Sequence, residues 1–179
     1  PASLNWAVDR VAPTTAITST PPTVTNVTNA SLTFTSNEPT ATFECRLDTA
    51  VFAPCSSPAT YAGLAAGKHT FRVRAVDPAS NVDASPAVYT WNIDTTPPNT
   101  SITRKPAAVT TSTSATFTFT SNQAKSTFEC NLDNGGFAAC ASPATYNGLA
   151  LGSHNFQVRA IDPVSNVDAT PVIVDWTIQ

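Results

Sequence analysis

The sequence repeats itself at an interval of 85 residues without a gap, because Trp6, Trp91 and Trp176 are each separated by that number (91 − 6 and 176 − 91). A period of this size corresponds to a whole domain, since solenoid turns and propeller blades are shorter. The same offset relates five further pairs: Cys45 and Cys130, Cys55 and Cys140, Tyr61 and Tyr146, His69 and His154, Asp77 and Asp162. We therefore expect two copies of one module, at residues 11–95 and 96–179.

Residues 1–10 match the end of a module, since PASLNWAVD at 1–9 resembles PAVYTWNID at 86–94. Three apolar side chains in this segment alternate with other residues as in a strand: Leu4, Trp6 and Val8. The segment is thus predicted to be an orphan closing strand. It either closes a preceding module outside this sequence or is donated to a neighbouring subunit, although both modules already have closing strands of their own.

Net charge and hydropathy exclude two classes of partner. The chain carries a net charge of −3, with only 12% charged residues. This is not the basic footprint of a nucleic-acid-binding protein. No stretch approaches the roughly 18 apolar residues of a membrane span. We expect neither a nucleic-acid partner nor membrane insertion.

Apolar side chains alternate with a period of two, which is typical of strands that have one face on a core. Phe71, Val73 and Ala75, for example, alternate with Arg72 and Arg74. Turn residues separate about seven such segments in each module. The strands expected in the first module lie near 15–19, 30–36, 42–48, 51–54, 58–62, 67–77 and 86–94. The same strands are expected 85 residues later in the second module. This pattern predicts an all-β fold of two tandem Greek-key β-sandwiches, plus the extra N-terminal strand.

The four cysteines form one pair per module, and the two members of each pair are 10 positions apart in the sequence. Four thiols allow three connectivities, and the repeat favours Cys45–Cys55 and Cys130–Cys140. Each pair would join the two strands of a hairpin. Disulfides indicate an oxidising compartment, so the chain is expected to be extracellular or on the cell surface.

Two stretches of the sequence resemble known families. The run from Leu64 to Asp77 resembles the E–F corner and F strand of a fibronectin type III domain, with Phe71 where that family usually has tyrosine. The larger pattern resembles bacterial immunoglobulin-like tandem repeats of large secreted or surface proteins. Its motifs are FECRLD at 43–48, CSSP at 55–58 and YAGL at 61–64. The resemblance implies Ig-like modules that serve as spacers, stalks, adhesin shafts or accessory domains.

Acidic and amide side chains recur near the end of each module: Asp77, Asn81, Asp83 and Asp94 in the first, and Asp162, Asn166 and Asp168 in the second. Oxygen-rich turns of this kind could bind Ca²⁺, which takes six to eight oxygen ligands. At most four side chains are in reach, so Asx turns, in which the side chains accept hydrogen bonds from nearby backbone N–H groups, are the favoured interpretation. Apart from this possible Ca²⁺ ion, no cofactor is expected.

Other polar residues are predicted to have structural roles. His69 and His154 begin a long strand without a second metal ligand or a recognisable base partner. Glu44 and Arg74 are expected to form an outward-facing ion pair on neighbouring strands. Three sequons are candidates for N-glycosylation: Asn26, Asn29 and Asn99.

No phosphate loop, nucleophile elbow or catalytic carboxylate pair occurs, so no enzyme activity is expected. The repeat favours a structural extracellular protein that forms a rod, stalk or filament, assembled through residues 1–9. Its partners would be identical or homologous modules arranged end to end, as in a homopolymer, with each module adding about 35 Å. The alternative is an adhesin or carbohydrate-binding accessory module of a large secreted protein.

Overall fold

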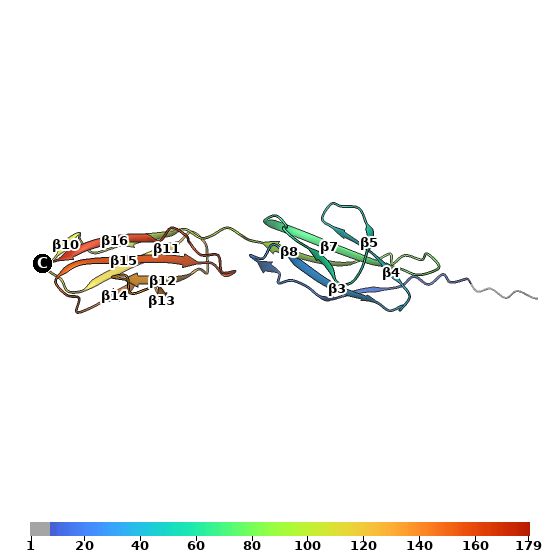
Figure 1. Ribbon diagram of the computed structural model, residues 1–179, viewed down its shortest axis with the longest axis horizontal. Helices are drawn as coiled ribbons and strands as arrows, with labels where there is room; N and C mark the ends of the chain where they lie inside the picture. The colour runs from blue at the N-terminus through green and yellow to red at the C-terminus, as the bar shows by residue number, and fades with distance from the viewer. Residues whose placement is uncertain (1–7) are drawn as a thin grey trace, which may run out of the picture. The chain divides into compact units, whose positions relative to one another are not determined.

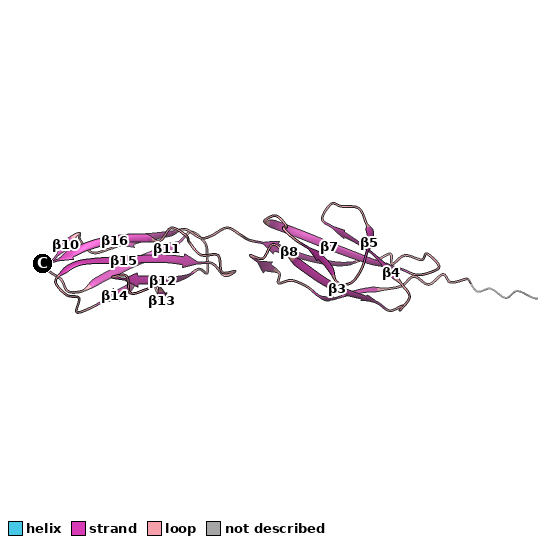
Figure 2. Ribbon diagram, viewed as in Figure 1, coloured by secondary structure: helices cyan, strands magenta, loops and turns pink. Residues whose placement is uncertain are grey.

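The computed structural model describes residues 8–179, which consist of strands joined by loops and turns (Figure 1; Figure 2). The chain divides into two compact units. The first ends at Thr95, and the second covers Thr96–Gln179. Within the described residues, no helix is long and apolar enough to cross a membrane.

The first unit consists of two sheets, one with three strands and one with five. The order of the smaller sheet is β1-β3-β6, and that of the larger is β2-β8-β7-β4-β5. Neighbouring strands are antiparallel except β2 and β8, which are parallel. The strands are β1 (Thr15–Ser19), β2 (Val24–Thr25), β3 (Ala30–Ser36), β4 (Thr42–Leu47), β5 (Ala53–Cys55), β6 (Ala59–Tyr61), β7 (Gly67–Val76) and β8 (Ala87–Ile93).

The second unit repeats this arrangement strand for strand. Its sheets have the orders β14-β11-β9 and β10-β16-β15-β12-β13. The strands are β9 (Thr100–Arg104), β10 (Val109–Thr110), β11 (Ala115–Ser121), β12 (Thr127–Leu132), β13 (Ala138–Cys140), β14 (Ala144–Tyr146), β15 (Gly152–Ile161) and β16 (Val172–Ile178). The predicted fold class, all-β with two tandem Ig-like sandwiches, is confirmed.

Each unit encloses its own hydrophobic core, formed by the inward side chains of both sheets. In β7 the side chains of Phe71, Val73 and Ala75 are buried, whereas the arginines between them point outward. Trp91 of β8, which is 1% exposed, belongs to the same core. In the second unit, Phe156 of β15 stacks on Phe117 of β11 with ring centroids 3.9 Å apart. Period-two alternation therefore decides which residues meet between the sheets.

The structure differs from the sequence-based prediction at two places in each unit. The two-residue strands β2 and β10 were not predicted, because two paired residues are too few to show a periodic pattern. The hairpin strand predicted at 51–54 begins only at Ala53. The chain turns directly after β4, where Asp48 adopts a left-handed conformation with φ of 51° and Ala50 N donates to Leu47 O. This turn takes up the residues that were assigned to the strand.

We expect a core truncation to destabilise only the unit that contains it. Replacing Phe156 with alanine should lower the unfolding free energy of the second unit by about 3–5 kcal/mol, because the deleted ring leaves a cavity. Differential scanning calorimetry should then show one transition shifted and the other unchanged. Phe71→Ala is the matched change in the first unit.

Val88→Ala is the control, because this outward side chain is 52% exposed and its truncation should change stability by less than about 0.5 kcal/mol. If Phe156→Ala shifted both transitions equally, the two units would not be independent folding units.

Candidate functional site

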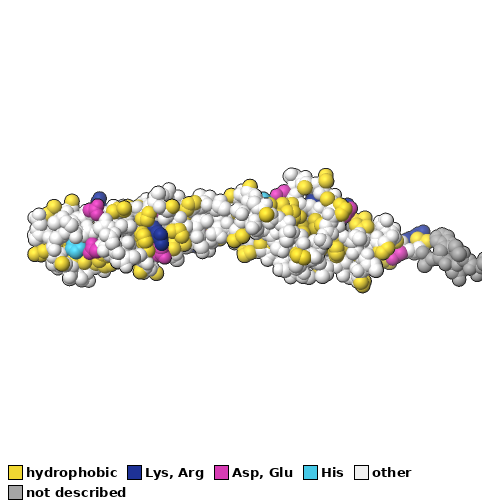
Figure 3. All heavy atoms as spheres, viewed as in Figure 1, with side chains coloured by type: hydrophobic (Ala, Val, Ile, Leu, Met, Phe, Trp, Pro, Cys, Tyr) yellow, Lys and Arg dark blue, Asp and Glu magenta, His cyan; other side chains and the backbone are white. Residues whose placement is uncertain are grey.

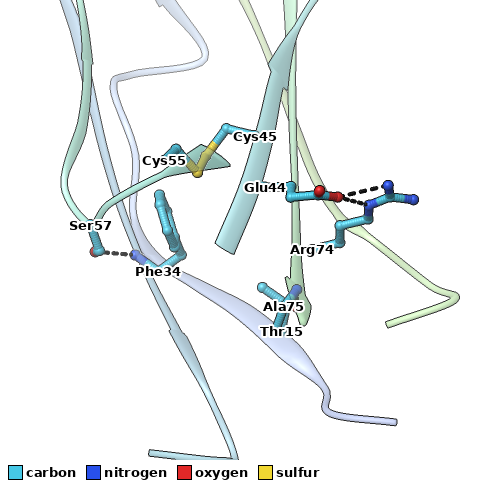
Figure 4. The surroundings of a disulfide bond; sticks show 8 residues. All are labelled: Thr15, Phe34, Glu44, Cys45, Cys55, Ser57, Arg74 and Ala75. Carbon is cyan, nitrogen blue, oxygen red and sulfur yellow. Dashed lines mark hydrogen bonds and ion pairs between the residues drawn. A yellow bond between two sulfur atoms is a disulfide. The ribbon is translucent and has the colours of Figure 1, made fainter. Parts of the chain in front are cut away.

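A disulfide closes the β4–β5 hairpin of the first unit (Figure 4). Cys45 and Cys55 have their Cα atoms 5.7 Å apart, and the corresponding bond of the second unit joins Cys130 and Cys140 at 5.8 Å. These are the pairs that the repeat favours. Direct pairing across the hairpin joins Cys45 with Ala53, so the bonded cysteines are diagonal neighbours.

The disulfides stabilise their own units, because each encloses a short loop of the same chain. The bonded positions are separated by 10 in the sequence, and restriction of the unfolded chain contributes about 2–3 kcal/mol to each unit. Cys45 is buried and belongs to the core of the first unit. A small domain has only about 5–15 kcal/mol of stability in total, so the bridge is a substantial part of it.

The acidic turn after β7 is held by its own side chains. Asp77 is buried, and its two carboxylate oxygens accept hydrogen bonds from the backbone N and the side-chain Nδ2 of Asn81, both at 2.7 Å. Asp162 and Asn166 make the corresponding bonds at 2.8 Å. This is the geometry of an Asx-type turn, which was the favoured interpretation of the sequence.

A second buried carboxylate ties the first strand of each unit to the opposite sheet. Asp83 Oδ2 accepts a hydrogen bond from Thr15 N at 2.9 Å, and Thr15 Oγ1 accepts one from Ala75 N in β7 at 2.8 Å. Asp168 receives both the N–H and the hydroxyl of Thr100. Although burial alone would raise it, hydrogen bonds from Thr100 and Thr170 hold the pKa of Asp168 below its usual range.

Four of the residues named as calcium candidates therefore use their carboxylates for hydrogen bonds within their own units: Asp77, Asp83, Asp162 and Asp168. Asp94 follows β8, and its backbone N donates to Thr25 O. Across residues 8–179, no three or more His, Cys, Asp or Glu side chains are grouped so that they could hold a metal ion. Calcium binding at these turns stays a prediction, and the hydrogen bonds support the alternative of Asx turns.

Each unit contains a contact between a histidine, a partly exposed carboxylate and a buried tryptophan. His69 Nδ1 lies 2.8 Å from Asp48 Oδ2, and His69 Nε2 lies 2.9 Å from Ala65 O. The imidazole packs against Trp91 with ring centroids 5.5 Å apart. A carbonyl oxygen and an ionised carboxylate only accept hydrogen bonds, so both ring nitrogens must donate. The geometry therefore favours the protonated imidazolium.

The second unit repeats this cluster. His154 contacts Asp133 at 2.8 Å and Ala150 O at 2.9 Å, and its ring stacks on Trp176. In both units the hydrogen bond to the backbone carbonyl is the largest cause that raises the histidine pKa; the carboxylate raises it further, and burial opposes the shift. Although burial would raise it, hydrogen bonds from Asn155 N and His154 hold the pKa of Asp133 below its usual range.

The carboxylate partners of these histidines, Asp48 and Asp133, were not recognised in the sequence. Asp48 is the first residue after β4, and the pairing of Leu47 with Phe71 brings it beside the start of β7. The signal in the sequence was the repetition of Asp48 as Asp133 at the same offset as the histidines. Because both ring nitrogens are occupied, the histidines clamp the loop before the long strand to the turn after β4 and have no lone pair available as a general base.

The predicted outward ion pair is present in both units. Arg74 contacts Glu44 at 2.7 Å through both Nε and a terminal nitrogen (Figure 4), and Arg159 contacts Glu129 in the same way at 2.8 and 2.7 Å. Each arginine also lies over an aromatic ring, with 4.3 Å between Arg74 Cζ and the centroid of Phe52. The repetition of this arrangement indicates a structural role for the pair.

The residues predicted for the orphan strand and for glycosylation lie in different parts of the chain. Leu4 and Trp6 lie outside the described residues, and Val8 is 56% exposed and not part of a strand. Among the candidate glycosylation residues, Asn99 is exposed, Asn26 is half-buried, and Asn29 accepts a hydrogen bond from Gly63 N. Nothing in the structure tests their modification.

Two shallow depressions occur on the described surface. One, of about 610 Å³, lies beside the histidine cluster of the second unit and is lined mainly by polar side chains, including Asp133, Asn155 and Asp175. The other, of about 360 Å³, lies between β3 and β6 in the first unit. The face drawn in Figure 3 is mostly neutral and polar, with scattered apolar and few charged side chains.

The strand order places β1, β3 and β6 in one sheet against β8, β7, β4 and β5 in the other, with the chain crossing repeatedly between them. Each unit is a fibronectin type III-like sandwich. No family model matches the sequence, and the search of curated proteins finds no match.

Solved structures of fibronectin type III-like and other modules are similar. The fibronectin(III)-like modules of Clostridium thermocellum CbhA are 18% identical with a TM-score of 0.47, over 93% of this chain and 94% of theirs. Murine CEACAM1b is 14% identical with a TM-score of 0.41, over 93% and 99%. The central fibronectin-III array of RIM-binding protein is 18% identical with a TM-score of 0.34, over 84% and 63%. At these levels of identity and TM-score, the likeness says nothing about activity.

The histidine clusters predict a stability that decreases as the pH rises through neutrality. A histidine whose pKa is raised on folding stabilises the folded state fully below its ordinary value near 6.5, and this contribution is lost as the pH rises through the folded-state pKa. Urea unfolding should therefore give a lower midpoint at about pH 8.5 than at about pH 5.5.

His69→Gln combined with His154→Gln should abolish this decrease, because glutamine does not titrate. His-tag-free protein is needed, since a tag would add further titrating groups. Equal midpoints for the unmodified protein at the two pH values would contradict the assignment of the imidazolium form.

Proposed function

We propose that the chain is a structural, non-catalytic, extracellular repeat that supplies length to a rod, stalk or filament. Its partners are identical or homologous modules joined end to end, and residues 1–9 provide the closing strand of another module. Support comes from the path of the chain through each unit, from the joint between the units and from the repeated structural contacts.

The observation that carries this proposal is that the chain begins and ends each unit at opposite ends of the long strand. Thr15, at the start of β1, accepts a hydrogen bond from Ala75 near the end of β7. Ile93, at the end of β8, pairs with Gly67 at the start of β7. These two positions of β7 are about 26 Å apart at the usual rise of a strand.

The second unit has the same path. Thr100 accepts a hydrogen bond from Ala160, and Ile178 pairs with Gly152. A module whose first and last strands open at opposite ends extends an array with every copy, whereas a module with both termini at one end would make it fold back. The course of the chain through each unit therefore favours a repeat that lengthens an array of modules.

The joint between the units supports the same function. Six residues, 94–99, separate β8 from β9, and two of them are Pro97 and Pro98. Proline fixes φ and favours extended, semi-rigid connections. A short joint of this composition suits a spacer that keeps its length.

Strand donation by residues 1–9 is supported by the role of their counterparts. Trp91 and Ile93 of β8, which match Trp6 and Val8, are each 1% exposed in the core of the first unit. A segment with the same alternation has the side chains needed to complete an equivalent core in another module. The extracellular setting rests on the two disulfides, which persist in oxidising compartments.

We expect the joint to be semi-rigid in solution. Small-angle X-ray scattering of the chain should give a maximum dimension that falls, and a distance distribution that broadens, when Pro97 and Pro98 are both changed to glycine. Pro163→Gly, an exposed proline in a loop within the second unit, is the matched control and should leave the scattering curve unchanged. Identical curves for the unmodified protein and the Pro97/Pro98 variant would contradict a stiff spacer.

Assembly through residues 1–9 predicts ordered fibres of the purified chain in electron micrographs, with an axial repeat of one or two module lengths. Trp6→Ser should abolish them, because a polar side chain cannot fill the position that Trp91 fills in the first unit. Val11→Ser, at a position that is 69% exposed, is the control and should leave the fibres intact. Monomers of the unmodified chain under all conditions would exclude self-assembly but not a semi-rigid spacer.

A further inference from the structure

Four cations project from the outward side of β4 and β7 in the first unit, here called the cationic face: Arg46, Lys68, Arg72 and Arg74. Glu44 is the one carboxylate on the outward side of these two strands, which leaves a net charge of +3. The whole chain has nine lysines and arginines and a net charge of −3. Nearly half of its cations thus gather on two adjacent strands of an otherwise acidic protein.

The register of the sheet leaves most of these charges without compensation. Glu44 lies opposite Arg74 and pairs with it, but Arg46 lies directly opposite Arg72. Like charges in this position destabilise a sheet. Within residues 8–179, no ion pair neutralises the other three cations of this face, and Arg46 Nε has no hydrogen-bond partner. The next carboxylate along the chain, Asp48, is bonded to His69.

An aromatic ring holds part of the cationic face in place. Phe52 lies 5.1 Å from Arg46 Cζ and 4.3 Å from Arg74 Cζ. A guanidinium that stacks on a ring keeps the N–H groups along its edge for carboxylate or sulfate oxygens. The ring holds the Arg46 guanidinium beside that of Arg74, which already uses N–H groups on Glu44, whereas Arg46 forms no ion pair in the described residues.

The duplication separates the structural residues of this region from the others. Glu44, Phe52 and Arg74 have the counterparts Glu129, Phe137 and Arg159, which make the same contacts. The remaining cations have neutral counterparts at the same offset: Asn131 for Arg46, Ser153 for Lys68 and Gln157 for Arg72. The same sandwich therefore forms without these three charges, and the fold does not explain them.

We infer that the cationic face of the first unit binds an acidic polysaccharide. Along and across the strands, about 5–7 Å separates neighbouring cations among Arg46, Arg72 and Arg74, and Lys68 lies about 13 Å from Arg72 along β7. Such a row of positive charges suits a polymer with repeated anionic groups. Thr70, Thr90 and Asn92 lie beside them in β7 and β8 and offer hydroxyl and amide groups to sugar hydroxyls. Arginine recognises both carboxylate and sulfate through paired hydrogen bonds.

Other partners fit this surface less well. β4 and β7 are inner strands whose backbone groups are paired on both sides, so an acidic peptide cannot add to them as a further strand. In the second unit of another chain, the corresponding strands β12 and β15 carry Glu129 and Arg159, and the neighbouring β16 adds Asp175. The net charge of this face is only −1, which complements the cationic face poorly. In the extracellular setting of the proposed function, on which this step rests, polysaccharides and not nucleic acids are the abundant polyanions.

The test is binding of the full chain to immobilised heparin, which is sulfated, and to polygalacturonate, which is carboxylated, with dextran as the neutral reference. The unmodified protein should bind at least one acidic polymer and not dextran, with an affinity that falls as salt is added. The variant Arg46→Asn/Lys68→Ser/Arg72→Gln introduces the residues of the second unit and should bind at least tenfold more weakly. Comparing the two acidic polymers identifies the anionic group.

The control variant Arg104→Gln/Lys105→Gln/Lys125→Gln removes the same number of charges from the second unit and should bind as the unmodified protein does. The melting temperature of both variants is measured as well, so that a loss of binding caused by misfolding is recognised. If both variants bound the acidic polymers equally weakly, binding would depend on the overall charge and not on a defined site, which would overturn the inference. So would absence of binding to both acidic polymers, or tighter binding to poly-glutamate, which would indicate an acidic protein partner.

Discussion

The long strand of each unit is the element on which the rest of the structure depends. β7 pairs with both β4 and β8, and its alternation puts Phe71, Val73 and Ala75 into the core while Arg72 and Arg74 face outward. Its first residues hold the histidine clamp, and its last residues receive β1 through Thr15. A shift of one residue in its register would exchange the two faces and remove the core, the clamp and the outward charges together.

The sequence was sufficient for the parts of the fold that repeat periodically. The alternation in β3, β7 and β8 predicted the strands and their buried faces, and the doubled cysteine spacing predicted the bridges. β2 and β10 were missed because two residues have no period, and β5 was placed too early because the left-handed turn at Asp48 leaves little trace in composition. Strand edges depend on such turns more than on propensity.

Contacts between residues distant in sequence were harder to predict than elements. The partner of His69 is Asp48, which lies 21 residues earlier and meets it only because β4 and β7 pair in one register. The same holds for Asp83 and Thr15, which are 68 residues apart. Single residues of these types are common in loops, so only their repetition at a fixed offset distinguishes them, and that signal becomes specific once the strand pairing is known.

Duplication explains how one chain can keep a fold and still differ between its copies. Positions that face the core, cap a turn or clamp a loop are constrained in both units, because changes there cost several kcal/mol. Outward positions of a sheet tolerate substitution within about 0.5 kcal/mol, so they can change in one copy while the other is unaltered. Arg46, Lys68 and Arg72 differ from their counterparts at such positions, and their mutual repulsion opposes folding. Charges that the fold neither needs nor benefits from are best understood through a ligand that compensates them.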